Sequence, residues 1–227
     1  MITASNGRKG LRAATARAHL LEKLPPRFFR RTAVMLLGIV TLGLGIALFK
    51  ISLMGNDPSS AMAMAIAGAL GMDFSVVLIA LNTLFFVAEA LWGRRLIGVG
   101  TFVNWFCVGT ASTFFIRLLN GLFTVPDAFW GRLPLLPAGV LVLSFACSLY
   151  QTADLGIAPY DSLSIMLARR LPVPYFWCRI LTDCCCTLVA FALGGVVGLG
   201  TLLCSVGFGP FISFFTKHVA ERLCGNR

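Results

Sequence analysis

The chain has 227 residues, of which 58% are apolar and only 12% charged, which excludes the composition of an ordinary soluble globular protein. Its net charge of +10 would suit a nucleic-acid-binding protein, but eight of the 19 Lys and Arg residues lie in residues 1–32, and most others flank apolar runs. That distribution is typical of cytoplasmic anchoring next to anionic lipid, so we expect the lipid bilayer and not nucleic acid as the partner.

The first half is predicted to begin with a basic cytoplasmic tail, residues 1–32, followed by a membrane repeat, residues 33–120. Its apolar runs are long enough to cross a hydrocarbon core at about 33–54, 74–92 and 97–119. A break at Gly55–Ser60 separates the first two runs, with Pro58 suited to the first turn of a new helix. The helix that follows, 59–70, is only about 18 Å long, which is too short to span.

The second half repeats this order after a linker loop, residues 121–137, and forms the repeat 138–218. Spans are predicted at about 138–155, 175–193 and 198–217, and the break Gly156–Asp161, which contains Pro159, precedes a short helix at 160–171. A tail, residues 219–227, ends the chain. The sequence therefore predicts an all-α membrane protein with six transmembrane helices and two short non-spanning helices.

The two halves match in register over most of their length. With an offset of 101, Gly55 falls on Gly156 and Pro58 on Pro159; after a one-residue gap near Gly71 the offset becomes 100. The later matches include two GxGT segments, 98–101 and 198–201, and the pair Gly109 and Gly209. A register that is held through both the glycine–proline breaks and the GxGT segments indicates a duplicated unit of about 100 residues.

The Lys and Arg residues in the connections predict the topology. Six spans place the N-terminal tail, Arg94-Arg95, Arg169-Arg170 and the basic C-terminus on one side, which the positive-inside rule assigns to the cytoplasm. The loop 121–137 is then external. Three spans per repeat is an odd number, so the second repeat would be inverted relative to the first.

Three segments of the second half carry a family resemblance: Gly156-Ile-Ala-Pro-Tyr-Asp161, Gly194-Gly-Val-Val-Gly-Leu-Gly-Thr201 and Gly207-Phe-Gly-Pro210. With these segments the chain resembles the YczE/YitT group of bacterial integral membrane proteins. The resemblance covers roughly residues 33–218, and the length of the chain fits the YczE-like branch better. In the first half, the acidic position that the group has after the proline is Ser60, and Asp57 stands before the proline instead. The resemblance implies a multi-pass protein of the bacterial plasma membrane, and it implies no activity.

Arg179 and Asp183 are the first candidate site residues. Asp183 lies nine residues after Pro174, about 14 Å along its helix and so near the middle of the bilayer. Arg179 lies one helical turn earlier, within pairing reach. Ionisable residues inside a membrane are costly and commonly functional, so the pair is interpreted either as part of a substrate or proton path or as a structural ion pair.

Asn82 and Thr83 occupy the positions of Thr182 and Asp183 in the other half. Inverted-repeat transporters build substrate sites from such midplane groups and from broken helices, which adds the break residues Gly55, Pro58, Gly156 and Pro159 as candidates. Hydrogen bonding between helices is the alternative for Asn82 and Thr83.

Acidic residues and glycine-rich segments near the span ends are further candidates, and Asp161 and the GxGT segments allow two interpretations each. Asp161 either joins the substrate site or stabilises the N-terminus of its short helix. Glu89 and Asp154 are expected to pair with Arg94-Arg95 and Arg169-Arg170. The GxGT segments either present backbone N–H groups to an anion or allow close packing.

Enzyme and metal signatures are largely missing from the sequence. It contains no HExxH or GxSxG, and His19 and His218 lie outside the predicted spans. None of the eight cysteines has the spacing of a zinc or redox site, and most lie within spans, where Cys acts as a small apolar residue. Tyr160-Asp161 with Asp183 resembles intramembrane aspartyl proteases only weakly. We expect no cofactor, no metal and no enzymatic activity.

These features together favour a small secondary-type transporter or permease for an unidentified small molecule or ion, since no ATPase motif is present. The alternative from a different class is a non-transporting membrane scaffold or sensor partner. A polar cavity lined by both halves would favour transport, whereas a dry centre would favour the scaffold.

Overall fold

The computed structural model describes residues 27–122, 129–195 and 197–225, and within these ranges every regular element is a helix. Most of the predicted basic tail and positions 123–128 of the predicted loop lie outside the described residues. The helices are α2 (Phe28–Ser52), α3 (Pro58–Leu70), α4 (Phe74–Trp92), α5 (Val99–Leu122), α6 (Phe129–Arg132), α7 (Leu135–Thr152), α8 (Pro159–Arg170), α9 (Tyr175–Ala192), α10 (Leu199–Phe215) and α11 (Glu221–Cys224). A 3₁₀ turn, Arg94–Leu96, precedes α5, and a π-type turn, Thr216–Ala220, follows α10.

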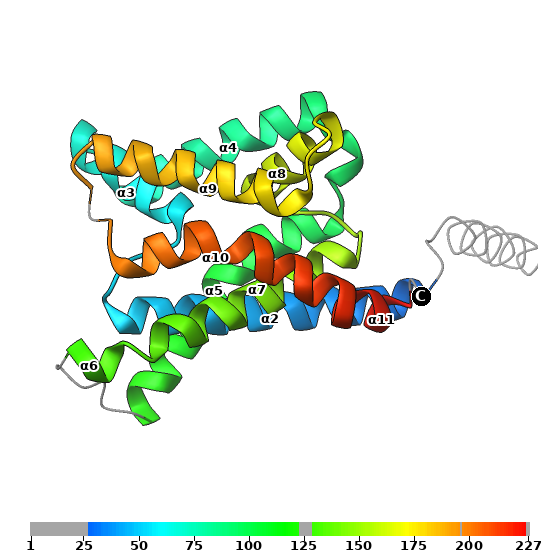
Figure 1. Cartoon of the computed structure of the whole chain (residues 1–227), viewed down its shortest axis with the longest axis horizontal. Coiled ribbons are helices and arrows are strands. Elements are labelled where there is room, and N and C mark those ends of the chain that lie inside the picture. The colour runs from blue at the N-terminus through cyan, green and yellow to red at the C-terminus, as the bar shows by residue number, and fades with distance from the viewer. Residues whose placement is uncertain (1–26, 123–128, 196, 226–227) are drawn as a thin grey trace, which may run out of the picture.

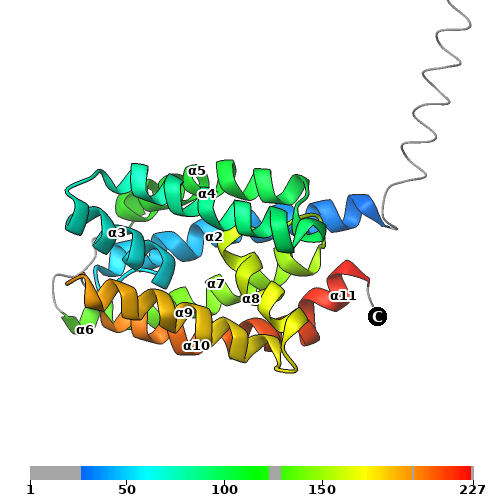
Figure 2. The same ribbon diagram turned by 90° about the horizontal axis from the view of Figure 1, so that it is seen from above.

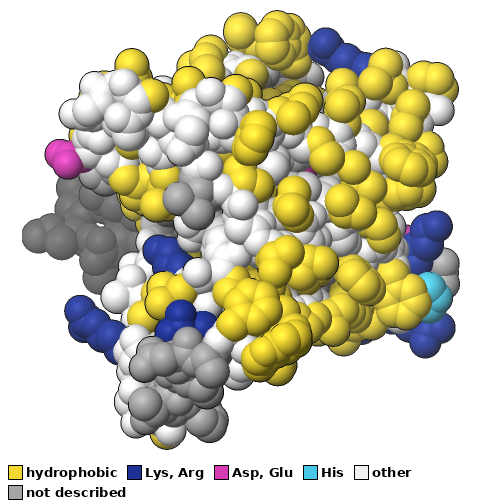
Figure 3. Space-filling view, turned by 60° about the vertical axis from the view of Figure 1, so that its left-hand side comes forward, with side chains coloured by type: hydrophobic (Ala, Val, Ile, Leu, Met, Phe, Trp, Pro, Cys, Tyr) yellow, Lys and Arg dark blue, Asp and Glu magenta, His cyan; other side chains and the backbone are white. Residues whose placement is uncertain are grey.

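The helices have the length and composition of a multi-pass membrane protein. In the described part of the chain, five stretches are long and apolar enough to cross a bilayer: Phe28–Ser52, Val99–Leu122, Phe129–Thr152, Tyr175–Ala192 and Leu199–Cys224. Two shorter apolar helices are Pro58–Leu70 and Val76–Trp92. Figure 3 shows hydrophobic side chains over much of one face, most densely on its right-hand side, as expected of a surface in contact with lipid.

Helices α2 and α7, which match each other in sequence, pack together in the lower layer of Figure 1 and lie between α5 and α10 in Figure 2. Helix α5 packs on α2, and its counterpart α10 packs on α7. Helix α3 packs on α9, and their counterparts α8 and α4 also pack together. Exchanging the two halves therefore maps these contacts onto each other.

The two chain breaks pack against the GxGT segments of the opposite half. Gly55 and Gly156 have φ of +135° and +120°, a backbone conformation that favours glycine. Next to these breaks, the N–H of Gly100 donates to the carbonyl of Leu155 at 2.7 Å, and the N–H of Gly200 donates to that of Met54 at 3.0 Å. Because these N–H groups are occupied by the breaks, the structure favours close packing over anion binding for the GxGT segments.

Candidate functional site

A buried charge network joins α8 to α9. The Arg179 guanidinium donates through Nε to Asp183 Oδ2 at 3.0 Å and through Nη1 to Asp161 Oδ1. The hydroxyl of Tyr160 donates to the other oxygen of Asp183. All three charged residues are buried, and the most exposed of them, Asp161, is only 7% exposed. The network therefore fixes the first turn of α8 against the middle of α9.

The network stays buried because each charge has an opposite partner and a geometry that suits it. A planar guanidinium can donate to two carboxylates at once, which a lysine ammonium does less well. The guanidinium also lies 5.1 Å from the centre of the Tyr160 ring and 5.8 Å from that of Phe208, within cation–π range. Because the network has two carboxylates and one guanidinium, its net formal charge is negative by one unit when all three residues are ionised.

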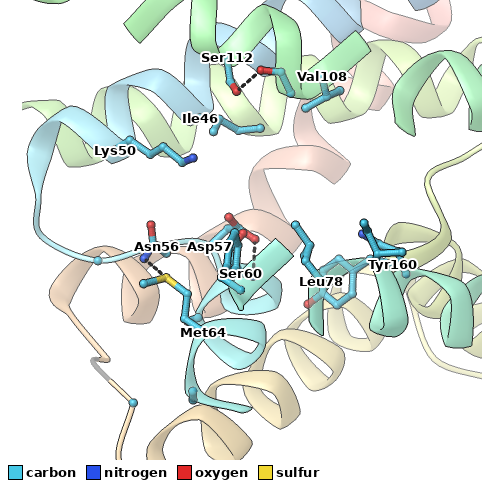
Figure 4. Close-up of a pocket in the computed structure, with 18 of the residues that line it drawn as sticks. Ile46, Lys50, Asn56, Asp57, Ser60, Met64, Leu78, Val108, Ser112 and Tyr160 are labelled. Atoms are coloured by element: carbon cyan, nitrogen blue, oxygen red, sulfur yellow. Dashed lines mark hydrogen bonds between the residues drawn. The ribbon is translucent and has the colours of Figure 1, made fainter. Parts of the chain in front are cut away.

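A cavity of about 1260 Å³ lies beside this network, between α2 and α5 on one side and α3 and α4 on the other (Figure 4). It reaches the N-terminus of α8 and the turn after α9, so both halves of the chain line it. Its walls are mostly apolar. The polar side chains among its lining residues are Lys50, Asn56, Asp57, Ser60, Asn82, Asn104, Ser112 and Tyr160.

Tyr160 connects the cavity to the charge network. Its side chain is among those that line the cavity, and its hydroxyl is the group that donates to Asp183. Asn104, on the α5 wall, is 6% exposed, and its Nδ2 has no hydrogen-bond partner within the described part of the chain. A buried unsatisfied donor in a cavity wall is the kind of group that a polar ligand satisfies.

The cavity exists because one pair of helices is apart while its counterpart is closed. Helix α9 packs along α10, where Gly209 lies so close to the backbone of Phe176 that a Cβ would clash with it. A hydrogen bond of 2.7 Å between Thr187 and Ser205 also joins these helices. The equivalent glycine on α5, Gly109, lines the cavity and has nothing within 4 Å of where a Cβ would lie.

Aromatic side chains join α4 to α5 at Trp105, in the cavity wall. The ring of Phe86 lies 6.3 Å from that of Phe102 and 6.0 Å from that of Trp105. Away from this contact, the N-terminal part of α4 and the middle of α5 form opposite walls of the cavity.

The structure brings some of the predicted site residues together and separates others. Arg179, Asp183 and Asp161 form one cluster, but they are not among the residues lining the cavity. Asn82 lines the cavity, as do the break residues Gly55 and Pro159, whereas Pro58 and Gly156 are not among the lining residues. Thr83 is exposed and donates to the carbonyl of Ile79 at 2.8 Å, so it lies outside both the cluster and the cavity.

Sequence reasoning missed Lys50 and Asn104 as residues of the cavity wall. It also missed that Tyr160 lines the cavity and bonds to Asp183. Lys50 lies near the end of its apolar run, and Asn104 has no polar counterpart, because Cys204 occupies the equivalent position. The only available signal for Asn104 was an amide in the middle of an apolar span.

Two expected ion pairs are corrected by the structure. Asp154 pairs with Arg31 at 4.0 Å and not with Arg169-Arg170. Glu89 is fully buried, and neither carboxylate oxygen has a hydrogen-bond partner within the described ranges. Its expected partner Arg94 donates from Nε to the carbonyl of Ala90 at 2.8 Å. The physical reason is helix orientation: Glu89 faces inward where α4 packs on α8, whereas Arg94 is exposed.

Across residues 27–122, 129–195 and 197–225, no group of three or more His, Cys, Asp or Glu is placed to hold a metal ion. The cysteines are all free thiols, and Cys184, Cys185 and Cys186 differ in exposure as they turn around α9.

Comparison with known proteins identifies uncharacterised relatives. The chain is 28% identical over 193 residues to an uncharacterized protein of Haemophilus influenzae, covering 85% of this chain and 86% of that protein. It is 24% identical over 178 residues to the uncharacterized membrane protein YczE of Bacillus subtilis, covering 78% of this chain and 81% of that protein. No solved structure matches the chain significantly. The model of a family of unknown function, DUF6198, matches residues 29–217, so the chain belongs to the DUF6198 family.

Proposed function

We propose that the chain is a small secondary-type transporter of the bacterial plasma membrane and that the cavity between α4 and α5 is part of its substrate path. In this proposal α4 is a sixth span, both termini are cytoplasmic, the loop 121–137 is external, and the two halves are inverted repeats. The charge distribution supports this topology, since Arg94-Arg95 and Arg169-Arg170 then lie on the cytoplasmic side.

The observation that carries the proposal is the difference between the two matching helix pairs. Helices α9 and α10 are closed on each other, whereas α4 and α5 are apart and leave the cavity. If the halves are inverted repeats, a second state can exist in which α4 and α5 are closed and α9 and α10 are apart. That state would open a path on the opposite side of the membrane. Exchange of this kind is how inverted-repeat transporters alternate access to one site.

The direction of opening follows from the topology. The cavity is lined by Phe74 and Leu78 near the N-terminus of α4, and by Val108 and Ser112 of α5. The proposed topology places the N-terminus of α4 and the C-terminus of α5 on the external side. The structure would then correspond to an outward-facing state.

The charge network supports a role other than hydrolysis. In aspartyl hydrolases, two carboxyl groups face each other and share a proton. Here the Arg179 guanidinium bonds to both Asp161 and Asp183, and Tyr160 donates to Asp183 as well. We therefore propose that the network holds α8 in place on α9 and does not catalyse a reaction.

The proposal is tested by the accessibility of single cysteines in membrane vesicles, with the exposed Cys107 and Cys185 replaced by Ser. Asn82→Cys faces the cavity, and Thr83→Cys, its neighbour on the outer surface of the same helix, is the matched control. A membrane-impermeant maleimide is expected to label Asn82→Cys from the external side and to leave Thr83→Cys, which would face lipid, unlabelled. The equivalent variant Thr182→Cys is expected to label from the cytoplasmic side in inverted vesicles.

Two results would contradict the proposal. Equal labelling of Asn82→Cys and Thr83→Cys would show that no water-filled path reaches α4. Labelling of Asn82→Cys from outside, with Thr182→Cys closed to reagent from the cytoplasm, would indicate a fixed pocket and favour the scaffold or sensor role.

A further inference from the structure

We infer that the cavity binds a small zwitterion with an apolar body, whose anionic group lies at Lys50 and whose cationic group lies at Asp57. This inference names the ligand class of the proposed transport site, and it rests on the proposed function only for the claim that the bound molecule is carried across the membrane.

The described residues of the cavity wall carry one cation and one anion, on facing elements. Lys50 comes from the end of α2, and Asp57 from the residue that caps α3. Figure 4 shows the Lys50 side chain extending into the space that separates it from Asn56 and Asp57. Among the described residues, neither charge has an ion-pair partner within 4.0 Å. Opposite charges that face a shared cavity without pairing match a ligand that carries both signs.

Asp57 has one oxygen left for a ligand. Its Oδ2 accepts a hydrogen bond of 3.0 Å from the backbone N–H of Ser60, which caps the N-terminus of α3. Its Oδ1 makes no hydrogen bond within the described part of the chain. One side chain can thus hold the helix end and accept from an ammonium group at the same time.

Asn104 gives independent evidence for a polar ligand. Its Nδ2 is buried, lies in the cavity wall and has no partner among the residues that the structure describes. Leaving a buried donor unpaired is costly, so an acceptor on a bound molecule would stabilise this wall. A carboxylate is such an acceptor.

The rest of the wall selects for an apolar body. Phe74, Leu78 and Ile79 contribute from α4, and Trp105 and Val108 from α5. Ligand sites are typically of this kind, with a few placed polar groups in a mostly apolar surface. Leucine and phenylalanine are simple probes that combine an ammonium, a carboxylate and an apolar side chain.

The test is thermal unfolding and calorimetric titration of the purified full chain in detergent with matched probes. Leucine carries both charges, 4-methylpentanoate lacks the ammonium, and 3-methylbutylamine lacks the carboxylate. At millimolar concentration, leucine or phenylalanine is expected to raise the melting temperature. Each singly charged probe is expected to bind with an affinity at least about tenfold lower than that of leucine. Failure of both amino acids, or equal binding of a singly charged probe, would overturn the inference.

Variants separate the site from general charge effects. Asp57→Asn keeps a residue that caps helices well, and Lys50→Gln keeps a long polar side chain, so both are expected to fold. Each should weaken leucine binding about tenfold or more. Asp73→Asn and Lys217→Gln remove the same charges from exposed positions outside the cavity and should leave binding unchanged. Wild-type affinity in Asp57→Asn or Lys50→Gln would contradict the assigned site.

Failure of this inference can be told from failure of the proposed function. If leucine binds as expected but Thr182→Cys remains closed to cytoplasmic reagent, the zwitterion site stands and transport is refuted. If the cysteines label as expected but neither amino acid binds, transport stands and the ligand class is refuted.

Discussion

Arg179 holds two buried carboxylates with one guanidinium, and this network accounts for how α8 is fixed on α9. The pairing with Asp183 could be predicted from sequence, because the two residues lie one turn apart on a helix. The contact with Asp161 could not, since it depends on the way the chain folds back after the second break. The hydrogen bond from Tyr160 to Asp183 could not be predicted for the same reason.

Replacing Arg179 should show that its shape matters as well as its charge. Arg179→Met leaves buried carboxylates without a partner and is expected to lower the free energy of unfolding by about 3–5 kcal/mol. Arg179→Lys keeps the charge but cannot reproduce the forked geometry, so it should lose about 1.5–3 kcal/mol. Thermal melts in detergent measure both. A Lys variant as stable as the wild type would show that charge alone suffices.

At the scale of elements, the two breaks are segments through which each half of the chain packs against the GxGT segment of the other half. Their glycines were recognised in the sequence by the repeat. Their packing partners were not, because a register between halves says nothing about which segments meet in space. The helix ranges could be predicted to within a few residues because apolar runs and proline-containing breaks determine them.

Alanine at the break glycines should destabilise the fold. In Gly156→Ala the new Cβ would lie 2.7 Å from the Thr101 backbone nitrogen, and the residue would keep a positive φ. We expect a loss of about 1–3 kcal/mol in the free energy of unfolding, measured by thermal melts. Gly68→Ala, in an open helical position, is the control and should be neutral or stabilising by about 1 kcal/mol. Equal stability of both variants would show that the break tolerates a side chain.

Gly109 and Gly209 offer a sharper comparison, because they are equivalent residues in the open and the closed helix pair. Gly109→Ala meets no neighbour in this structure and should fold normally, whereas Gly209→Ala clashes with Phe176 and should disturb the α9–α10 contact. Under alternating access, Gly109→Ala also blocks closure of α4 on α5. Cytoplasmic labelling of Thr182→Cys should then fall in Gly109→Ala, with stability unchanged. Unchanged labelling would argue against closure at this glycine.

At the scale of the whole molecule, the chain is a multi-pass membrane protein whose described part is helical, and its matching helices make matching contacts, except where α4 and α5 separate. The sequence could predict the duplicated pattern but not this exception. The closed pair has Thr187 and Ser205 where the open pair has Val87 and Trp105, but apolar periodicity alone does not show which pair closes. The cavity and its polar wall follow from how these helices are placed.

The most direct test of alternating access is a pair of distance measurements by pulsed electron paramagnetic resonance on spin-labelled protein in lipid nanodiscs. One pair of labels is placed at Val76 and Phe114, across the open helices, and the other at the equivalent positions Phe176 and Phe214. Alternating access predicts two distances for each pair of labels. Conditions that shorten the Val76–Phe114 distance should lengthen the Phe176–Phe214 distance. A single fixed distance in each pair under all conditions, with Val76–Phe114 always the longer, would contradict it.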